Sequence, residues 1–89
     1  MKIEFDNTKD EINRQKHGLS LAFGARIFDD PDLLVLTAIR NEDDEERYKA
    51  VGLVEGKLYT AVHVWRGEVV RFLSVRRSNT SEEEAYYRD

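Results

Sequence analysis

Residues 47–77 read RYKAVGLVEGKLYTAVHVWRGEVVRFLSVRR. This segment contains three apolar runs of strand length, which are Arg47 to Val54, Leu58 to Trp65 and Val69 to Arg77. The turns between them, Glu55-Gly56 and Arg66-Gly67-Glu68, are short, and each contains the glycine that tight hairpins favour. Because short turns join neighbouring antiparallel strands, we predict a β-meander here.

Two further strands are predicted before this segment. Leu33 to Ile39 is the first strand of a four-strand meander, and the acidic turn Asn41–Glu46 joins it to the next strand. Lys2 to Phe5 alternates polar and apolar residues, which predicts a short N-terminal strand. We therefore expect an antiparallel sheet made of the four-strand meander and the N-terminal strand.

Three helices are predicted around this sheet. Asp6 is a good N-cap for a helix from about Asn7 to His17, which Gly18 ends. A second short helix, capped by Ser20, has apolar residues at spacings of three and four: Leu19, Ala22, Phe23 and Ile27. The sequence Asn-Thr-Ser at 79–81, followed by three glutamates, is a capping-box signature for a short C-terminal helix. This order of elements predicts one α+β domain over residues 1–89, with two N-terminal helices on the sheet.

The composition excludes several classes of protein. The chain has 89 residues, a formal net charge of −4 and no cysteine, which excludes disulfide scaffolds, thiol nucleophiles and cysteine-based metal sites. No apolar stretch approaches the roughly 18 residues of a membrane span, and the charged N-terminus does not resemble a signal peptide. We expect a cytoplasmic protein without membrane association, and no residue spacing indicates a metal site or a cofactor.

Positive charge is concentrated near the C-terminal end of the predicted sheet. Between residues 57 and 77 a single acidic residue, Glu68, stands against five basic ones, which are Lys57, Arg66, Arg71, Arg76 and Arg77. Arginines interleaved with aromatic residues suit RNA, because guanidinium groups bind phosphate and aromatic rings stack on unpaired bases. On spacing alone, the commoner explanation is an ordinary solvated sheet edge with one core tryptophan.

The first predicted helix carries a polar stripe at helical spacing, formed by Lys9, Asn13, Lys16 and His17. His17 lies in the last turn, where the negative end of the helix favours the imidazolium form. A cationic histidine beside a lysine suits phosphate binding or proton donation, and the alternative is a solvent-facing stripe. Glu82 and Tyr86 share one side of the last helix, as surface pairs on helices also do.

Taken in order, these segments resemble the BrnT family, the toxins of a bacterial type II toxin–antitoxin system. Phe5-Asp6, Lys9, Asn13 and Lys16-His17-Gly18 are similar to the opening motif of the family, and Ile27 to Pro31 is similar to its apolar-Phe-x-Asp-Pro stretch. The other matching motifs are Glu46-Arg47 with Gly52, Arg66-Gly67, Ser74-Val75-Arg76-Arg77, and Glu82 with Tyr86. Each motif is weak alone, but the ordered set is specific.

The resemblance implies a fold like that of the RelE ribonucleases and an RNA-cleaving activity that stops translation. It also implies a cognate, BrnA-like antitoxin with a ribbon-helix-helix part, whose complex with the toxin would bind operator DNA. RNA cleavage without a metal needs a base, an acid and cations around the phosphate. The candidate catalytic residues are His17, Arg47, Arg76, Glu82 and Tyr86. The candidate RNA-binding residues are Lys16, Arg66, Arg71 and Arg77.

The roles within this set stay open. His17 is a candidate acid, and Glu82 or Tyr86 is a proton-handling or an orienting group. We expect Arg76 to matter most, through the cleavage rate rather than through folding. The acidic run Glu42–Glu46 is either a docking site for a basic antitoxin segment or a solvated loop. Two other functions remain: a toxin fold that binds its antitoxin without cutting RNA, and a small single-stranded RNA-binding domain.

Overall fold

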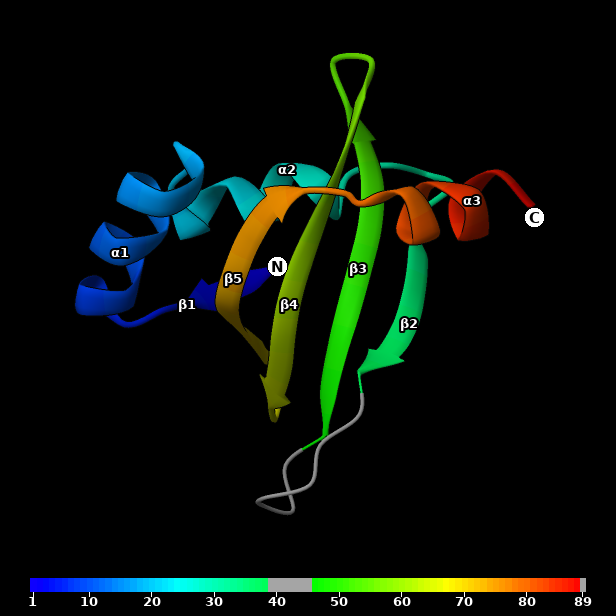
Figure 1. The fold of residues 1–89 in the computed structure, drawn as a ribbon. Helices are drawn as coiled ribbons and strands as arrows, with labels where there is room; N and C mark the ends of the chain where they lie inside the picture. The colour runs from blue at the N-terminus through cyan, green and yellow to red at the C-terminus, as the bar shows by residue number, and fades with distance from the viewer. Residues whose placement is uncertain (39–45, 89) are drawn as a thin grey trace.

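In the described part of the chain, five strands form one sheet in the order β1-β5-β4-β3-β2 (Figure 1). The strands are β1 (Lys2–Glu4), β2 (Leu34–Ala38), β3 (Arg47–Val54), β4 (Lys57–Arg66) and β5 (Val69–Arg77). The computed structural model describes residues 1–38 and 46–88. Strands β2 to β5 form the predicted antiparallel meander. The predicted end of the first meander strand at Ile39 and most of the acidic run, residues 42–45, lie outside the described residues.

The N-terminal strand was predicted wrongly as part of an antiparallel sheet. β1 pairs with β5 in parallel, with Ile3 opposite Val70, so the sheet is mixed. A hairpin turn forces two strands to run antiparallel, but β1 is followed by a helix and pairs with the last strand of the chain. No short turn therefore fixes the direction of β1, and the local sequence pattern carries no information about it.

The first and last helices begin where their capping residues predict. Asp6 is the N-cap of helix α1 (Asn7–His17), and its carboxylate accepts the Thr8 and Lys9 N–H groups. Gly18, which has a φ of 74°, is the C-cap. Asn79 directly precedes helix α3 (Thr80–Arg88) and caps its first turn. The Asn79 side chain accepts the Glu82 N–H at 2.8 Å, and the Glu82 carboxylate accepts the Asn79 N–H at 3.0 Å. This reciprocal pair is the predicted capping box.

The second predicted helix is divided into two short pieces. A 3₁₀ turn, η1 (Leu21–Phe23), is capped by the Ser20 hydroxyl, and the four-residue helix α2 (Gly24–Ile27) follows it directly. Gly24 lies at the junction, and a Cβ there would be 2.6 Å from Cε1 of Phe72. The glycine therefore lets this segment pack closely on β5. Among the described residues, no helix is long and apolar enough to cross a membrane.

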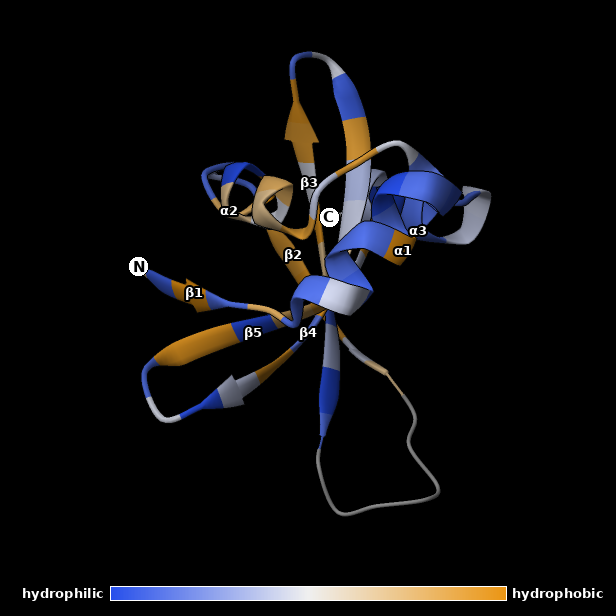
Figure 2. Ribbon diagram, turned by 90° about the vertical axis from the view of Figure 1, so that its left-hand side faces the viewer, coloured by the Kyte–Doolittle hydropathy of each residue, from blue (hydrophilic) through white to orange (hydrophobic). Residues whose placement is uncertain are grey.

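The main core lies between one sheet face and the segment η1–α2. Its buried residues are Leu21, Ile27, Ala50, Val54, Ala61, Val70, Phe72 and Val75. Figure 2 shows that the strands carry most of the hydrophobic segments, whereas α1 and α3 are largely hydrophilic. Trp65 is not the core aromatic residue of this sheet, because 46% of it is exposed; Phe72 is fully buried instead. A smaller cluster on the other face joins Tyr86 of α3 to Val51 and Leu58.

Helix α1 lies beside β5 (Figure 1), and Asn13 connects the two. The Asn13 amide donates to the carbonyls of Leu19 and Val75, both at 2.8 Å, and its oxygen accepts the Val75 N–H at 3.1 Å. This side chain thus binds both backbone groups of Val75, as a neighbouring strand does. Asn13 is only 5% exposed, so the solvent-facing alternative is wrong for this residue, although Lys9, Asn13, Lys16 and His17 do lie on one face. It caps the edge of β5 beyond the short pairing with β1.

Candidate active site

The sheet face opposite η1–α2 is rich in cations, and we call it the basic face. Side chains alternate along a strand, so the burial of Ala50 and Val54 in the main core turns Arg47 and Lys49 to the basic face. Arg71 and Arg76 of β5 are five positions apart, which would put them on opposite faces of a regular strand, but the register shift at Val62/His63 keeps them on the same side. Strand alternation therefore gathers cations from β3 and β5, which sequence order alone does not bring together.

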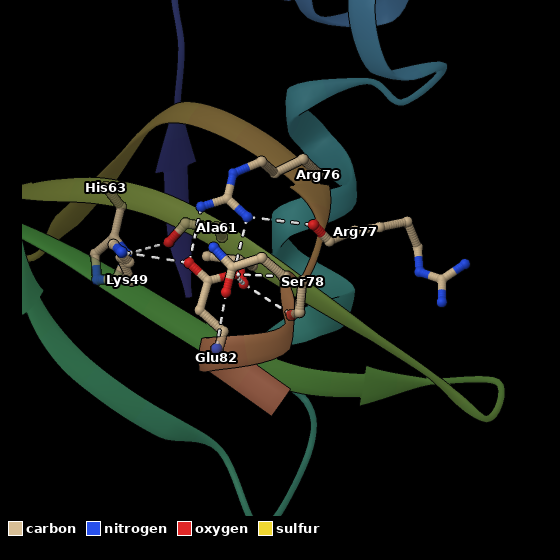
Figure 3. A network of polar contacts seen from close by, with 9 residues as sticks. Lys49, Ala61, His63, Arg76, Arg77, Ser78 and Glu82 are labelled. Atoms are coloured by element: carbon tan, nitrogen blue, oxygen red, sulfur yellow. Dashed lines mark hydrogen bonds and ion pairs between the residues drawn. The ribbon is translucent and has the colours of Figure 1, made fainter. Parts of the chain in front are cut away.

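Glu82 lies at one end of the basic face and is almost fully enclosed, with 2% of its side chain exposed. Arg76 binds it in a bidentate manner, with Nη1 2.8 Å from Oε1 and Nη2 2.8 Å from Oε2. Thr60 donates to Oε1 at 2.8 Å, and Lys49 Nζ lies 3.3 Å from Oε2. Figure 3 shows Arg76 and Lys49 converging on Glu82, whereas Arg77 points away. We call these residues, with Asn79, the Glu82 cluster.

The contacts of the Glu82 cluster keep Glu82 as an ionised carboxylate in a fixed position, so Glu82 is not suited to proton transfer. Burial by itself would raise the pKa of Glu82, but the hydrogen bonds from Arg76, the Asn79 N–H and Thr60, with the charge of Arg76, lower it to about 2. The hydrogen bond to Glu82 in turn raises the pKa of Arg76 against the effect of burial. Near neutral pH, Glu82 is therefore ionised and fully engaged, and it orients Arg76.

His17 lies in the last turn of α1 and is half-buried. Desolvation, and then the charges of Lys16 and Arg76, lower its pKa below the ordinary 6.5. This direction is opposite to the imidazolium form that the negative helix end alone favours, because burial and two neighbouring cations disfavour the charged ring. His17 also borders a shallow groove of about 150 Å³, lined by Lys9, Ile12, Asn13, Lys16, Leu73 and Ser74. At neutral pH the imidazole is uncharged and able to accept a proton.

Tyr86 lies on the same side of α3 as Glu82, but its hydroxyl is bound elsewhere. It donates to Oδ2 of Asp30 at 2.6 Å, and the same oxygen accepts the Leu53 N–H at 2.8 Å. Burial and the Asp30 carboxylate raise the pKa of Tyr86 above its ordinary value. The phenol therefore stays protonated and connects α3 to the loop before β2, so the structure does not bring this hydroxyl to Glu82.

The other predicted arginines lie in separate places. Arg71 Nη1 binds Glu4 Oε2 at 2.8 Å, and Arg66 Nε lies 4.0 Å from the same oxygen, toward the β4–β5 hairpin. The Arg77 guanidinium lies 5.5 Å from the ring centre of Tyr59, on the side of the main core. Arg47 has a buried Nε without a hydrogen-bond partner in the described part of the chain. Of the predicted catalytic residues, Arg76 and Glu82 are therefore in direct contact, and His17 is near enough for the charge of Arg76 to lower its pKa.

Sequence reasoning missed Lys49 and Thr60, which complete the Glu82 cluster. The available signal was the period of two along β3, which puts Lys49 on the same face as Arg47. No local pattern links Thr60 to Glu82, because the bend between β5 and α3 brings them together. Within residues 1–38 and 46–88, no group of three or more His, Cys, Asp or Glu side chains is placed to hold a metal ion.

The fold and this site define a small α+β protein whose mixed sheet presents a cation-rich face with an oriented arginine, suited to a polyanion. A family model described as "Ribonuclease toxin, BrnT, of type II toxin-antitoxin system" matches residues 5–82. The chain therefore belongs to the BrnT family of ribonuclease toxins. The match includes His17, Arg47, Arg76 and Glu82, and it ends before Tyr86. No curated protein sequence matches the chain.

Proposed function

We propose that this chain is a metal-independent endoribonuclease that cleaves RNA and inhibits translation in the cytoplasm. Its membership of a ribonuclease toxin family supports this function at the level of the family. The observation that carries the proposal for this chain is the bidentate pair between Arg76 and the enclosed Glu82 carboxylate. A guanidinium held in this way is already oriented when a phosphate arrives, so little order has to be gained in the transition state.

The reaction that fits these groups is attack of a ribose 2′-oxygen on the adjacent phosphorus. The new bond joins the 2′-oxygen to phosphorus, the bond from phosphorus to the 5′-oxygen breaks, and a cyclic phosphate is left. Neutral His17 accepts the 2′-hydroxyl proton, because its pKa lies below 6.5. The 5′-oxygen takes a proton from solvent water. This assignment gives His17 the role of base in place of the role of acid that its position in the helix favours.

The positive charges around the phosphate come from two arginines in this proposal. Arg76 stabilises the charge that develops on the phosphoryl oxygens, and Arg47 adds a second cation from the same face. Glu82 is a positioning residue that acts through Arg76. Tyr86 supports the site at a distance, because its hydroxyl ties α3 to Asp30.

The remaining cations are proposed to bind flanking nucleotides. Lys16 borders the groove beside His17, so it is placed to contact a phosphate next to the scissile one. Arg66 and Arg71, which share Glu4, lie farther along the basic face. Arg77 stacks near Tyr59 and offers a contact around the strand end.

A cognate antitoxin is the proposed partner, since the family belongs to type II toxin–antitoxin systems. We propose a ribbon-helix-helix antitoxin whose amphipathic segment covers the basic face, because arginines are enriched at interface hot spots. The complex would bind operator DNA through the antitoxin. Glu46, the one described residue of the acidic run predicted as an antitoxin contact, accepts a hydrogen bond from Tyr48.

The test is cleavage of RNA by the purified chain in the presence of EDTA, together with growth arrest and protein synthesis measured after induction. We expect the parent chain to cleave RNA with the chelator present, and Arg76→Lys to cleave slowly, because lysine does not reproduce the bidentate fork. RNA left intact by the folded parent chain favours a toxin fold that only binds its antitoxin. A gene neighbourhood without a ribbon-helix-helix reading frame favours a single-stranded RNA-binding domain.

A further inference from the structure

We propose that Lys49 and Arg76 form a single anion site, in which both cations contact the same RNA phosphate and Glu82 holds them together. The choice of RNA as the ligand rests on the proposed function. Lys49 comes from β3 and Arg76 from β5, so the site extends across β4, on which Thr60 lies between them.

The geometry brings the two cations to one atom. Lys49 Nζ lies 3.3 Å from Oε2 of Glu82, and Arg76 Nη2 lies 2.8 Å from the same oxygen. Two cations that share one carboxylate oxygen are close enough for one phosphate, which presents several acceptor oxygens, to bind both. The site therefore needs no rearrangement of the backbone to accept an anion.

The charge balance of the Glu82 cluster favours an added anion. One carboxylate faces two full positive charges, so the cluster keeps a net positive charge at neutral pH. Glu82 is closed off from solvent, with 2% of its side chain exposed, whereas 34% of Lys49 and 25% of Arg76 are exposed. The open side of the cluster is thus the cationic side, and a ligand reaches Lys49 and Arg76 without touching the carboxylate.

Lys49 makes one contact with Glu82 and keeps further hydrogens for a ligand. Three donors bind Oε1, which are Arg76 Nη1, the Thr60 hydroxyl and the Asn79 N–H, whereas Arg76 Nη2 binds Oε2. Lys49 is the second cation at Oε2, at 3.3 Å. An ammonium group has three hydrogens, so this contact leaves hydrogens for a phosphate. The side chain of Lys49 is also 34% exposed, which separates it from the enclosed Glu82.

The test compares Lys49→Gln with the matched control Lys57→Gln. Both variants remove one lysine charge, but Lys57 is exposed at the other end of the neighbouring strand and alternation turns it away from the basic face. The probe is a single-stranded RNA oligonucleotide with 2′-O-methyl groups, which lacks the attacking hydroxyl and is not cleaved. Its dissociation constant is measured by fluorescence anisotropy from about 50 to 200 mM salt.

We expect Lys49→Gln to weaken binding several-fold and to reduce the slope of log affinity against log salt by about 0.7, the value for one lost contact with a single strand. Lys57→Gln should keep the parent slope, and Lys49→Arg should restore it, because the charge returns. Melting curves for all three variants separate a lost contact from a lost fold. Equal slopes for Lys49→Gln and Lys57→Gln in folded proteins would overturn the proposal, and so would an unchanged deficit in Lys49→Arg.

Cleavage of ordinary RNA, measured in parallel, distinguishes this inference from the proposed function. If the parent chain cleaves RNA and the two glutamine variants bind the methylated probe equally well, the ribonuclease function stands and the shared anion site is refuted. If binding depends on Lys49 but the parent chain leaves ordinary RNA intact, the anion site stands and the ribonuclease function is refuted.

Discussion

Replacing Glu82 with glutamine removes one charge from an enclosed site and changes the shape of the side chain very little. The pKa of Glu82 falls from its ordinary 4.5 to about 2 in the folded protein. At about 1.36 kcal/mol for each tenfold change in proton affinity, the ionised carboxylate contributes about 3 kcal/mol to the free energy of unfolding. Breaking a buried pair by removal of one partner costs a similar amount. A domain of this size has a total stability of about 5–15 kcal/mol, so we expect Glu82→Gln to fold but to be clearly destabilised.

The pH dependence of this loss follows from the direction of the pKa shift. Because the folded state lowers the pKa of Glu82, the stabilisation is complete above about pH 4.5 and disappears as the pH falls toward about 2. The glutamine variant has no such titration. We therefore expect the stability difference between the parent and Glu82→Gln to be about 3 kcal/mol at pH 7 and to shrink steadily below pH 4.5.

Urea denaturation followed by circular dichroism at pH 7, 4 and 2.5 measures this difference directly. Glu84→Gln is the matched control, since Glu84 is an exposed glutamate of the same helix. Its effect should stay within about 0.5 kcal/mol at every pH. A loss for Glu82→Gln below about 1 kcal/mol at pH 7, or a gap that does not narrow in acid, would refute the reasoning.

Three further predictions follow from contacts of the site. Arg76→Ala should abolish most cleavage and also lower the free energy of unfolding by about 3 kcal/mol, because it leaves Glu82 enclosed without its main partner; parallel rate and urea measurements check both effects. Lys16→Gln should raise the pKa of His17, since it removes a neighbouring positive charge, and an NMR titration of the imidazole protons should show the higher midpoint. Asn13→Ala should lower the free energy of unfolding by about 2 kcal/mol or more, because it leaves a buried N–H and a buried carbonyl of β5 without a partner, and a melting curve would show the loss.

The first of these predictions departs from the sequence-based expectation that Arg76 acts on rate alone. That expectation treats Arg76 as an exposed side chain at a strand end. In the fold, three quarters of its side chain is covered, and both of its Nη atoms bind Glu82. Under the proposed function, catalysis and stability therefore depend on the same ion pair, and the two effects have to be measured separately.

Those parts of the fold that depend on residues close together in the sequence were predictable from it. The bounds of α1 are confirmed at both ends, because Asp6 and Gly18 act through their own backbone and side-chain geometry. The meander is confirmed, and its last two hairpins follow directly from two-residue turns, which bring a strand back beside the preceding one. The parallel pairing of β1 was not predictable in this way, because its partner lies at the other end of the chain.

The candidate site follows the same division. The capping-box pattern correctly predicts that Glu82 binds the Asn79 N–H. It does not predict the contacts of Glu82 with Arg76, Thr60 and Lys49, which depend on the register of the sheet. Asn13 looked like part of a polar surface stripe, because helical spacing cannot show that a strand edge lies against that face. Residue types therefore predict an anionic ligand, and tertiary packing decides which residues lie together.

The pairing of β1 with β5 has a consequence for the synthesis of this protein on the ribosome. Residues 2–4 pair with residues 69–71, and Asn13 binds the backbone of Val75, so two contacts that close the fold join opposite ends of the chain. Such distant contacts form slowly and only after the later segment has emerged. Arg76, whose charge acts on His17, follows Val75 directly, so His17 acquires this neighbour at the same stage of synthesis. A nascent chain interrupted before β5 consequently lacks the complete site, and the cell that makes this protein is exposed to a complete site only after β5 and the first turn of α3 have been translated.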